Sequence, residues 1–436
     1  GPPSSRTRHG RNIANIMTAL DDDETGVLAP SGHAAFTVAI AGDNTEDRIA
    51  IAYNTDIVEF GHLQCPTGTK EALSGPQRVE WLAAYRRELE AKIKNGTFTL
   101  VKRLRGMRVV RTKVAHALRR DASTNKVNEL RARWVGLGFL QGQGDFSETY
   151  SATPSATSVR IFLCAVLTLY LDLAQGDVTK AFTLNPIDVE MYVEQMPGME
   201  VAGEWPGATK ENTVCHLHKC LEGLKQSGNV WQRHHTEAML SFELTSHKLK
   251  FTQSTIDPTI FVLHAASGLI MVLVWIDDIL VGYSDRQLYD SFVALYTARF
   301  PSKHHMGCTR FAGLSIDYRQ NHSLTIHQQP HIELAYDKFV IDKAAAAISP
   351  ATTRIAIADR ESPKHYSKIT MAANDKERSI MQNKPFLSAL ATIMYVAHWS
   401  LPHIAYHCSY LGQFMHDPSV AAFDAVISLI IYAYHN

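Results

Sequence analysis

The sequence predicts an α+β protein, in which helices and strands occupy separate stretches of the chain. Apolar residues recur at every fourth position from Trp81 to Ile93, which is typical of an amphipathic helix. A short stretch at residues 173–177 and the apolar run at 268–283 are predicted strands. The C-terminal third adds three helical stretches, at residues 332–339, 386–399 and 420–434.

The composition is that of a folded chain with a sizeable core, because 45% of the 436 residues are apolar and 20% are charged. Its length predicts two to three domains. The six Cys form no Cys-x-x-Cys pair, which indicates reduced thiols in an intracellular protein. The longest apolar stretches, residues 161–171 and 268–276, have about half the length of a membrane span. We therefore expect no membrane partner.

The predicted elements begin after residues 1–75, which mix Gly, Asp, Asn and Thr with short apolar runs. This segment is predicted to be a partly ordered lead-in. The first helix should end at Asn95-Gly96, a pair that commonly stops helices. A second helix is predicted at residues 158–170, shortly before the first strand. Residues 344–364, rich in Ala, Ser, Pro and Thr, are predicted to link the C-terminal helices.

Charge is unevenly distributed along the chain, although the formal net charge is zero. Residues 78–133 carry 16 Lys and Arg against five Asp and Glu. A phosphate-binding face on one lobe would produce this asymmetry, because nucleic-acid backbones are held mainly by basic side chains. A solvated basic surface without a partner is the alternative interpretation.

Two adjacent acids, Asp277 and Asp278, interrupt an apolar run that resumes at Ile279. The pattern predicts a hairpin with both carboxylates at its tip. Carboxylates between buried strands are costly unless a cation compensates them, and Mg²⁺ prefers oxygen ligands. Asp177, which ends the predicted strand at residues 173–177, would complete a two-metal site. The alternative is an ordinary polar turn.

Several short segments match the sequence motifs of one known family and occur in the same order. From about residue 72 to residue 434, the chain resembles the reverse transcriptases of copia-type (Pseudoviridae) long-terminal-repeat retrotransposons. The segments that carry the resemblance include Asn95-Gly96-Thr97, Arg131-Ala132-Arg133-Trp134-Val135-Gly136, Gly144-Asp145-Phe146-Ser147-Glu148-Thr149-Tyr150, Gln175-Gly176-Asp177-Val178-Thr179-Lys180-Ala181-Phe182, Gly223-Leu224-Lys225-Gln226 and Trp275-Ile276-Asp277-Asp278. Their shared order is far more specific than any single motif.

The resemblance implies a right-hand polymerase. Its parts would be fingers at residues 76–160 with 186–213, a palm at 161–185 and 214–325, and a thumb and connection at 326–436. The implied reaction adds dNTPs to a primer 3′-hydroxyl on an RNA or DNA template, with Mg²⁺, or alternatively Mn²⁺, as cofactor. The family's RNase H domain would begin about where this sequence stops, so we expect that domain to be missing.

The resemblance also implies roles for individual residues. Asp177, Asp277 and Asp278 would be the catalytic acids and, together with Val178, the metal site. The residues expected to bind the incoming dNTP are Arg131, Arg133, Val178, Thr179, Lys180, Ala181, Phe182 and Gln226. The residues expected to contact template or primer are Gly223, Lys225, Phe311, Ala312 and Gly313. Phe182 would exclude a 2′-hydroxyl, with a core aromatic residue as the alternative. For Arg131 and Arg133 the alternative is an exposed basic residue.

The chain departs from the family pattern at several positions. Trp275 replaces the Tyr of the Tyr-x-Asp-Asp motif, which preserves an aromatic residue and both acids. Glu222 stands where a Tyr often precedes the loop glycine, and residues 113–117 and 227–229 also differ. An active polymerase is the leading interpretation. The alternative is a domesticated, inactive protein that binds nucleic acid or a protein partner.

The segment from Cys215 to Cys220 resembles a zinc site at first sight. In a strand, however, His216 and His218 would lie on one face and Cys215 on the other, which is a poor tetrahedral arrangement. A plain strand is therefore the preferred interpretation. A two-metal nuclease would need a further acid or a His base, and the sequence suggests none. The expected partners are template, primer and dNTPs, with a homodimer left open, and the expected location is cytoplasmic, within a particle, or nuclear.

Overall fold

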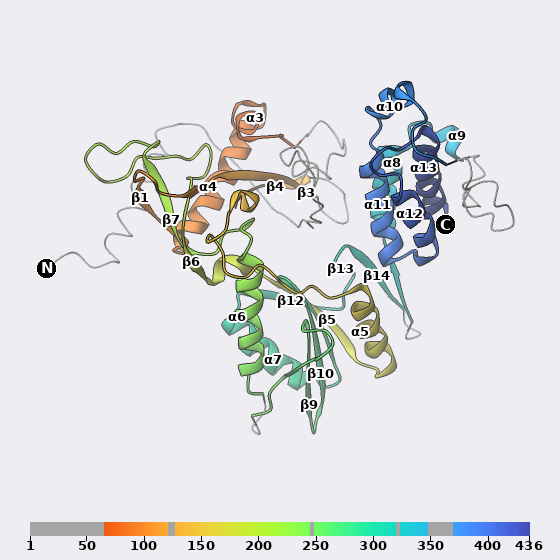
Figure 1. Ribbon diagram of the computed structural model, residues 1–436. Coiled ribbons are helices and arrows are strands. Elements are labelled where there is room, and N and C mark those ends of the chain that lie inside the picture. Colours follow the sequence, from red (N-terminus) through yellow and green to blue (C-terminus); the bar gives the residue numbers. More distant parts are fainter. Residues whose placement is uncertain (1–64, 121–126, 245–247, 320–322, 348–368) are drawn as a thin grey trace. The chain divides into compact units, whose positions relative to one another are not determined.

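The computed structural model describes residues 65–120, 127–244, 248–319, 323–347 and 369–436 (Figure 1). These residues belong to two compact units. The first unit comprises the residues up to 153 with 178–253 and 291–303, and the second comprises 154–177, 254–290 and 304–436. The predicted lead-in lies outside the described residues except for residues 65–75, which contain α3 (Thr69–Ser74). Most of the predicted linker at residues 344–364 also lies outside them.

A long helix and a β-hairpin form the centre of the first unit. Helix α4 (Arg78–Lys94) buries Trp81, Tyr85 and further residues at the predicted spacing. It ends as predicted, because Gly96 has a φ of 66°, a left-handed conformation that stops a helix. The helix packs on the hairpin formed by β3 (Thr112–Arg120) and β4 (Val127–Gly136). The predicted first helix is therefore confirmed.

Four strands form the sheet of the first unit. In spatial order they are β1 (Phe98–Lys102), β7 (Thr213–Lys219), β6 (Pro186–Val193) and β2 (Val109–Val110). Strand β7 is antiparallel to both neighbours, whereas β2 is parallel to β6. The remaining elements of this unit include η1 (Gly138–Leu140), η2 (Ala181–Leu184), α6 (Ser227–Ser241) and β8 (Thr252–Gln253).

A buried group of charged side chains joins α4 to the loop that follows β7. The Lys92 side chain is fully buried, its Nζ lies 3.2 Å from Glu88 Oε1, and it donates a hydrogen bond to Glu222 Oε2. Burial alone would lower the pKa of Lys92, but the two carboxylates outweigh burial and raise it. Burial likewise opposes ionisation of Glu222, yet Lys92 lowers the pKa of Glu222 below its usual value. Both partners are therefore charged in the folded protein.

The second unit contains the central strands of a sheet. Its strands β5 (Asp172–Val178), β11 (Asp278–Tyr283), β10 (Gly268–Trp275) and β9 (Ile260–Ala265) are neighbours in that order and pair antiparallel. Residues 304–306 of β12 (Ser302–Met306) flank β5. The hairpin predicted at residues 268–283 is thus confirmed as β10 and β11. Helix α7 (Arg286–Arg299) follows β11 and continues into the residues of the first unit.

A helix and a small sheet supply a further part of the core of the second unit. Helix α5 (Ala156–Thr168) begins at Ser155, whose side chain accepts a hydrogen bond from the Ser158 backbone N–H. The small sheet consists of β13 (Arg310–Phe311), β14 (Leu314–Arg319) and β15 (Ser323–His327). Apolar residues of α5, β10, β11 and this sheet form one buried cluster. Gly282 lets α5 approach closely, because an added Cβ would lie 2.8 Å from Val166.

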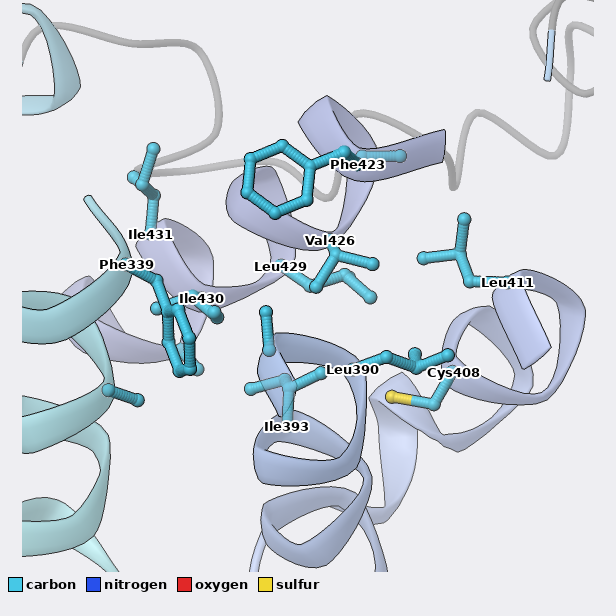
Figure 2. Packing of buried hydrophobic residues seen from close by; sticks show 14 of the residues in the cluster. Phe339, Leu390, Ile393, Cys408, Leu411, Phe423, Val426, Leu429, Ile430 and Ile431 are labelled. Carbon is cyan, nitrogen blue, oxygen red and sulfur yellow. The ribbon is translucent and has the colours of Figure 1, made fainter. Parts of the chain in front are cut away.

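The C-terminal part of the second unit is helical. Its elements are α8 (Gln329–Phe339), α9 (Lys343–Ala347), α10 (Asp375–Met381), α11 (Phe386–Trp399), η5 (Pro402–Ile404), α12 (Ala405–Gly412) and α13 (Val420–His435). Figure 2 shows Leu390 and Ile393 of α11 packed with Leu429 of α13 in the bundle core. The three helices predicted in this region are confirmed. Among the residues that the structure describes, no helix combines the length and apolarity needed to cross a bilayer.

Replacing Lys92 by Met should lower the free energy of unfolding by about 3–5 kcal/mol, because buried Glu222 would lose its lysine partner and Glu88 would lose one of its two, Lys180 being the other. Urea unfolding measures this value. The matched control is Lys94→Met on the same helix, because the Lys94 side chain is exposed. Equal stability of the two variants would contradict a structural role for the Lys92 ion pairs.

Candidate active site

Two neighbouring strands bring two of the predicted acids together. Strands β5 and β11 are antiparallel, and their register places Asp177 directly opposite Asp278. Side chains of directly opposed residues share a face of the sheet and lie about 4.5–5.5 Å apart at their Cβ atoms. The structure therefore joins an acid from residues 173–177 to the distant doublet, as the sequence predicted. The strand does not end at Asp177, however, because β5 continues to Val178.

The hairpin between β10 and β11 turns within two residues. Trp275 pairs with Asp278, so only Ile276 and Asp277 form the turn. Ile276 has a φ of 56°, which is strained for a β-branched residue. Asp278 is already the first residue of β11, and thus the doublet does not form an ordinary polar turn. Asp277 occupies the tip, whereas Asp278 occupies the strand.

The three carboxylates create an unfavourable electrostatic environment for one another. Burial is the largest cause that raises the pKa of Asp278, and with the negative charges of Asp277 and Asp177 it brings the pKa to about 7 despite opposing hydrogen bonds from Gln175. The site therefore holds negative charge that an additional cation would stabilise.

The donor set fits a hard divalent cation, because carboxylate oxygens are the ligands that Mg²⁺ prefers. Within the described part of the chain, no three His, Cys, Asp or Glu side chains are gathered into a ready-made metal site. Mg²⁺ is commonly held by one or two carboxylates together with substrate phosphates. The residues available to hold it are Asp177, Asp277 and Asp278.

A residue that the sequence interpretation missed contacts one of the acids directly. Gln175 donates hydrogen bonds from Nε2 to both carboxylate oxygens of Asp278, at 2.8 and 3.0 Å. It lies two positions before Asp177 on β5, so both side chains share one face of the sheet. The spacing of two positions between Gln175 and Asp177 could have placed Gln175 on the face of the acids. It could not have shown which acid the Gln175 amide contacts.

The aromatic residue of the hairpin packs beside the turn that was predicted to contact the primer. The Trp275 ring lies 6.3 Å from Phe311 and 5.6 Å from Trp399, measured between ring centroids. Ala312 and Gly313 form a tight turn between β13 and β14, with φ values of 50° and 79°. Tyr395 on α11 donates a hydrogen bond to the Ala312 carbonyl at 3.0 Å. The predicted turn is present, and its contact with a primer stays a prediction.

In the first unit, the predicted dNTP-binding residues have different environments. Arg131 and Arg133 are two positions apart on β4, so they lie on one face of the strand, and both are half-buried. Ala132 and Trp134 lie on the opposite face and are buried. Burial, followed by the neighbouring charge of Arg133, lowers the pKa of Arg131. The two guanidinium groups thus share one face of the hairpin, as a phosphate-binding pair would.

The segment after Asp177 forms a tight turn. Thr179 is exposed, and Lys180 has a φ of 57° with its Nζ 3.2 Å from Glu88 Oε2. Phe182 is half-buried in η2, between the buried Ala181 and Thr183. The Phe182 side chain is therefore not a fully enclosed core residue. Val178 is 1% exposed, and its predicted contact with a metal ion or dNTP stays a prediction.

Hydrogen bonds hold the loop after β7 against the end of β4 and the residues that follow it. Gly223 has a φ of 84° and its carbonyl accepts a hydrogen bond from Gly138, while the Lys225 N–H donates to Gln141 Oε1 at 2.7 Å. Gln226 is fully buried, and its amide exchanges hydrogen bonds with Gln141 and the Asp145 carbonyl. The polar groups of Gln226 are thus satisfied inside the protein, and its contact with a dNTP stays a prediction.

The apparent zinc motif is part of an ordinary strand. Cys215 is buried on one face of β7, and His216 and His218 lie on the other, with ring centroids 4.9 Å apart. The His216 ring stacks on Tyr192 of the neighbouring strand β6. All six Cys are free thiols. The preference for a plain strand is confirmed.

Comparison with known families gives a match to most of the chain. The family model described as "Reverse transcriptase (RNA-dependent DNA polymerase)" matches residues 95–353. The sequence is 28% identical over 382 residues to the retrovirus-related Pol polyprotein from transposon TNT 1-94 of Nicotiana tabacum, which covers 87% of this chain and 27% of that protein. It is 26% identical to the corresponding polyprotein from transposon RE1 of Arabidopsis thaliana, over 85% of this chain and 23% of that protein. The chain thus spans about a quarter of the length of these relatives.

Among solved structures, the foamy viral protease-reverse transcriptase dRH in complex with double-stranded DNA is similar with a TM-score of 0.38 and 12% identity. The match covers 81% of this chain and 47% of that one. A second structure of the foamy viral protease-reverse transcriptase with double-stranded DNA has a TM-score of 0.37 and 11% identity, and covers 98% of this chain and 68% of that one.

The raised pKa of Asp278 predicts a specific dependence of stability on pH. Between its ordinary value of 3.8 and about 7, the folded protein retains a proton that the unfolded chain releases. The free energy of unfolding should therefore fall as the pH rises through this window and level off above it.

The variant Asp278→Asn should remove this component and raise the melting temperature at pH 8, by roughly 2–4 °C for each kcal/mol of relieved repulsion. Thermal unfolding in EDTA at several pH values measures both effects. Asp172→Asn is the control, because Asp172 is an exposed acid at the other end of β5. An Asp278→Asn profile parallel to that of the parent would contradict the raised pKa.

Proposed function

The chain belongs to the reverse transcriptase (RNA-dependent DNA polymerase) family, and we propose that it extends a primer 3′-hydroxyl with dNTPs along an RNA or DNA template. The observation that carries this proposal is the pairing of Asp177 with Asp278, next to Asp277 at the hairpin tip. These are the acids that the family resemblance assigns to the chemical step. Their mutual repulsion supports a site that operates with cations bound.

We propose that Asp177, Asp277 and Asp278 hold Mg²⁺, with the Val178 carbonyl as a further oxygen ligand. When bound, a pair of such ions supplies activation of the primer hydroxyl and charge neutralisation at the leaving pyrophosphate. The protein contributes the fixed positions of the carboxylates. Their strands are buried, and Gly176 allows this packing because an added Cβ would lie 2.7 Å from the His304 ring.

The residues of the first unit would bind the substrates. Arg131 and Arg133 can offer paired donors to the triphosphate oxygens, and the ammonium group of Lys180 can offer a point charge. The basic residues of segment 78–133 would hold the phosphates of the template and primer by charge. The loop that contains Gly223 and Lys225 would support the template, because its backbone is fixed to the end of β4.

Loss of the tip acid should separate catalysis from folding. Asp277→Asn should reduce primer extension on a homopolymer template at least roughly 100-fold without lowering the melting temperature, because charge stabilisation at the reacting phosphate would be lost. Asp172→Asn should leave extension unchanged. Equal extension by Asp277→Asn and the parent would refute the proposed acid site. A parent protein that binds primer-template but extends nothing would favour the domesticated, non-polymerising alternative.

Phe182 should select the sugar of the incoming nucleotide. Phe182→Val should reduce the preference for dNTPs over rNTPs about tenfold or more, because a smaller side chain leaves room for a 2′-hydroxyl. Single-nucleotide incorporation with each substrate measures the preference. The matched control is Leu184→Val, since Leu184 is also half-buried in η2. An unchanged preference in Phe182→Val would assign Phe182 to packing alone.

A further inference from the structure

We propose that Gln175 is a positioning residue that orients the Asp278 carboxylate for divalent cations, an inference that rests on the proposed metal-dependent function. Gln175 and Asp278 come from adjacent strands, β5 and β11. In the register of these strands Gln175 lies opposite Leu280, so it reaches Asp278 diagonally along the same face. Its amide nitrogen lies 2.8 Å from Oδ1 and 3.0 Å from Oδ2 of Asp278.

The orientation of the Gln175 amide is fixed by the groups around it. Nε2 faces only acceptors, namely the Asp278 carboxylate and the Arg310 carbonyl at 2.9 Å. A carbonyl oxygen in that place would be repelled by both, so the NH₂ group must occupy it. Its two N–H bonds can serve these two acceptors, one each. Oε1 lies on the other side, 3.3 Å from His305 Nε2 and 3.3 Å from Cys308 Sγ, whose single S–H is shared between Oε1 and the Arg310 carbonyl at 3.5 Å.

The supporting groups are themselves well held. Cys308 is 5% exposed, and it lies in the short connection between β12 and β13. The Gly307 N–H donates to the Leu173 carbonyl at 2.7 Å, which ties this connection to β5. The same connection leads directly into Phe311 and the turn predicted to contact the primer. Gln175 thus links an acid of the candidate site to the base of that turn.

An amide suits this position for a chemical reason. It donates hydrogen bonds to a carboxylate without adding a positive charge, whereas Lys or Arg would compete with a bound cation for the same oxygens. Groups behind the ligands of a metal commonly fix ligand orientation in this way, and their removal weakens metal affinity roughly 10–100-fold. Gln175 should therefore affect how tightly cations bind, and not only whether the protein folds.

The test measures Mn²⁺ binding to the full chain by electron paramagnetic resonance, without nucleic acid or nucleotide. Gln175→Met preserves the length of the side chain and removes both donors. It should weaken Mn²⁺ binding roughly 10–100-fold, while thermal unfolding in EDTA stays close to that of the parent. Primer extension by the same variant should require correspondingly more Mg²⁺ to reach half of its maximal rate.

Two further variants keep the test decisive if Gln175→Met folds poorly. Cys308→Ala removes the donor to Oε1 and should weaken Mn²⁺ binding by a smaller factor, whereas Cys308→Ser restores a donor and should restore the affinity.

Mn²⁺ affinities within twofold of the parent in all folded variants would overturn the positioning role, even if their melting temperatures fell. A parent that binds Mn²⁺ but extends no primer would overturn the proposed polymerase, and the ratio of affinities would still decide the role of Gln175.

Discussion

The candidate site depends on the antiparallel pairing of β5 with β11. This pairing places Asp177 opposite Asp278 in a partly buried part of the sheet, where like charges repel one another more strongly than in water. A protein without a use for these acids would gain stability by losing them. The β-strand hydrogen bonds and the buried apolar residues around the acids hold them together despite that repulsion. The core of the second unit thus offsets the repulsion between these acids.

In the first unit, by contrast, buried charges are paired with charges of opposite sign. There, Lys92 is enclosed together with Glu88 and Glu222, so each ionised group has a partner of opposite charge. This arrangement also explains the departure at Glu222 from the residue common in the family, because the carboxylate is matched by a lysine on α4. A cluster of paired charges can stabilise the fold, whereas Asp177 and Asp277 raise the pKa of Asp278 by their like charge. The contrast supports a structural role for the first and a catalytic role for the second.

Much of the fold and part of the candidate site could be predicted from the sequence. The helix through Trp81 and Tyr85 and the hairpin at residues 268–283 follow from local periodicity, which depends only on near neighbours in the chain. The resemblance to copia-type reverse transcriptases is confirmed by the family match and by the plant transposon polyproteins. The boundaries of fingers, palm and thumb stay predictions. The roles of the substrate-binding residues also stay predictions.

The sequence by itself determined the family and the type of most elements, because these are properties of short segments and their order. Only the tertiary structure decided what each polar side chain contacts. It assigned Gln175 to Asp278, and it removed Gln226 from the surface by burying its amide against Gln141. Hydrogen bonds between residues roughly a hundred positions apart depend on strand register and loop packing. No local pattern of residues encodes either of these.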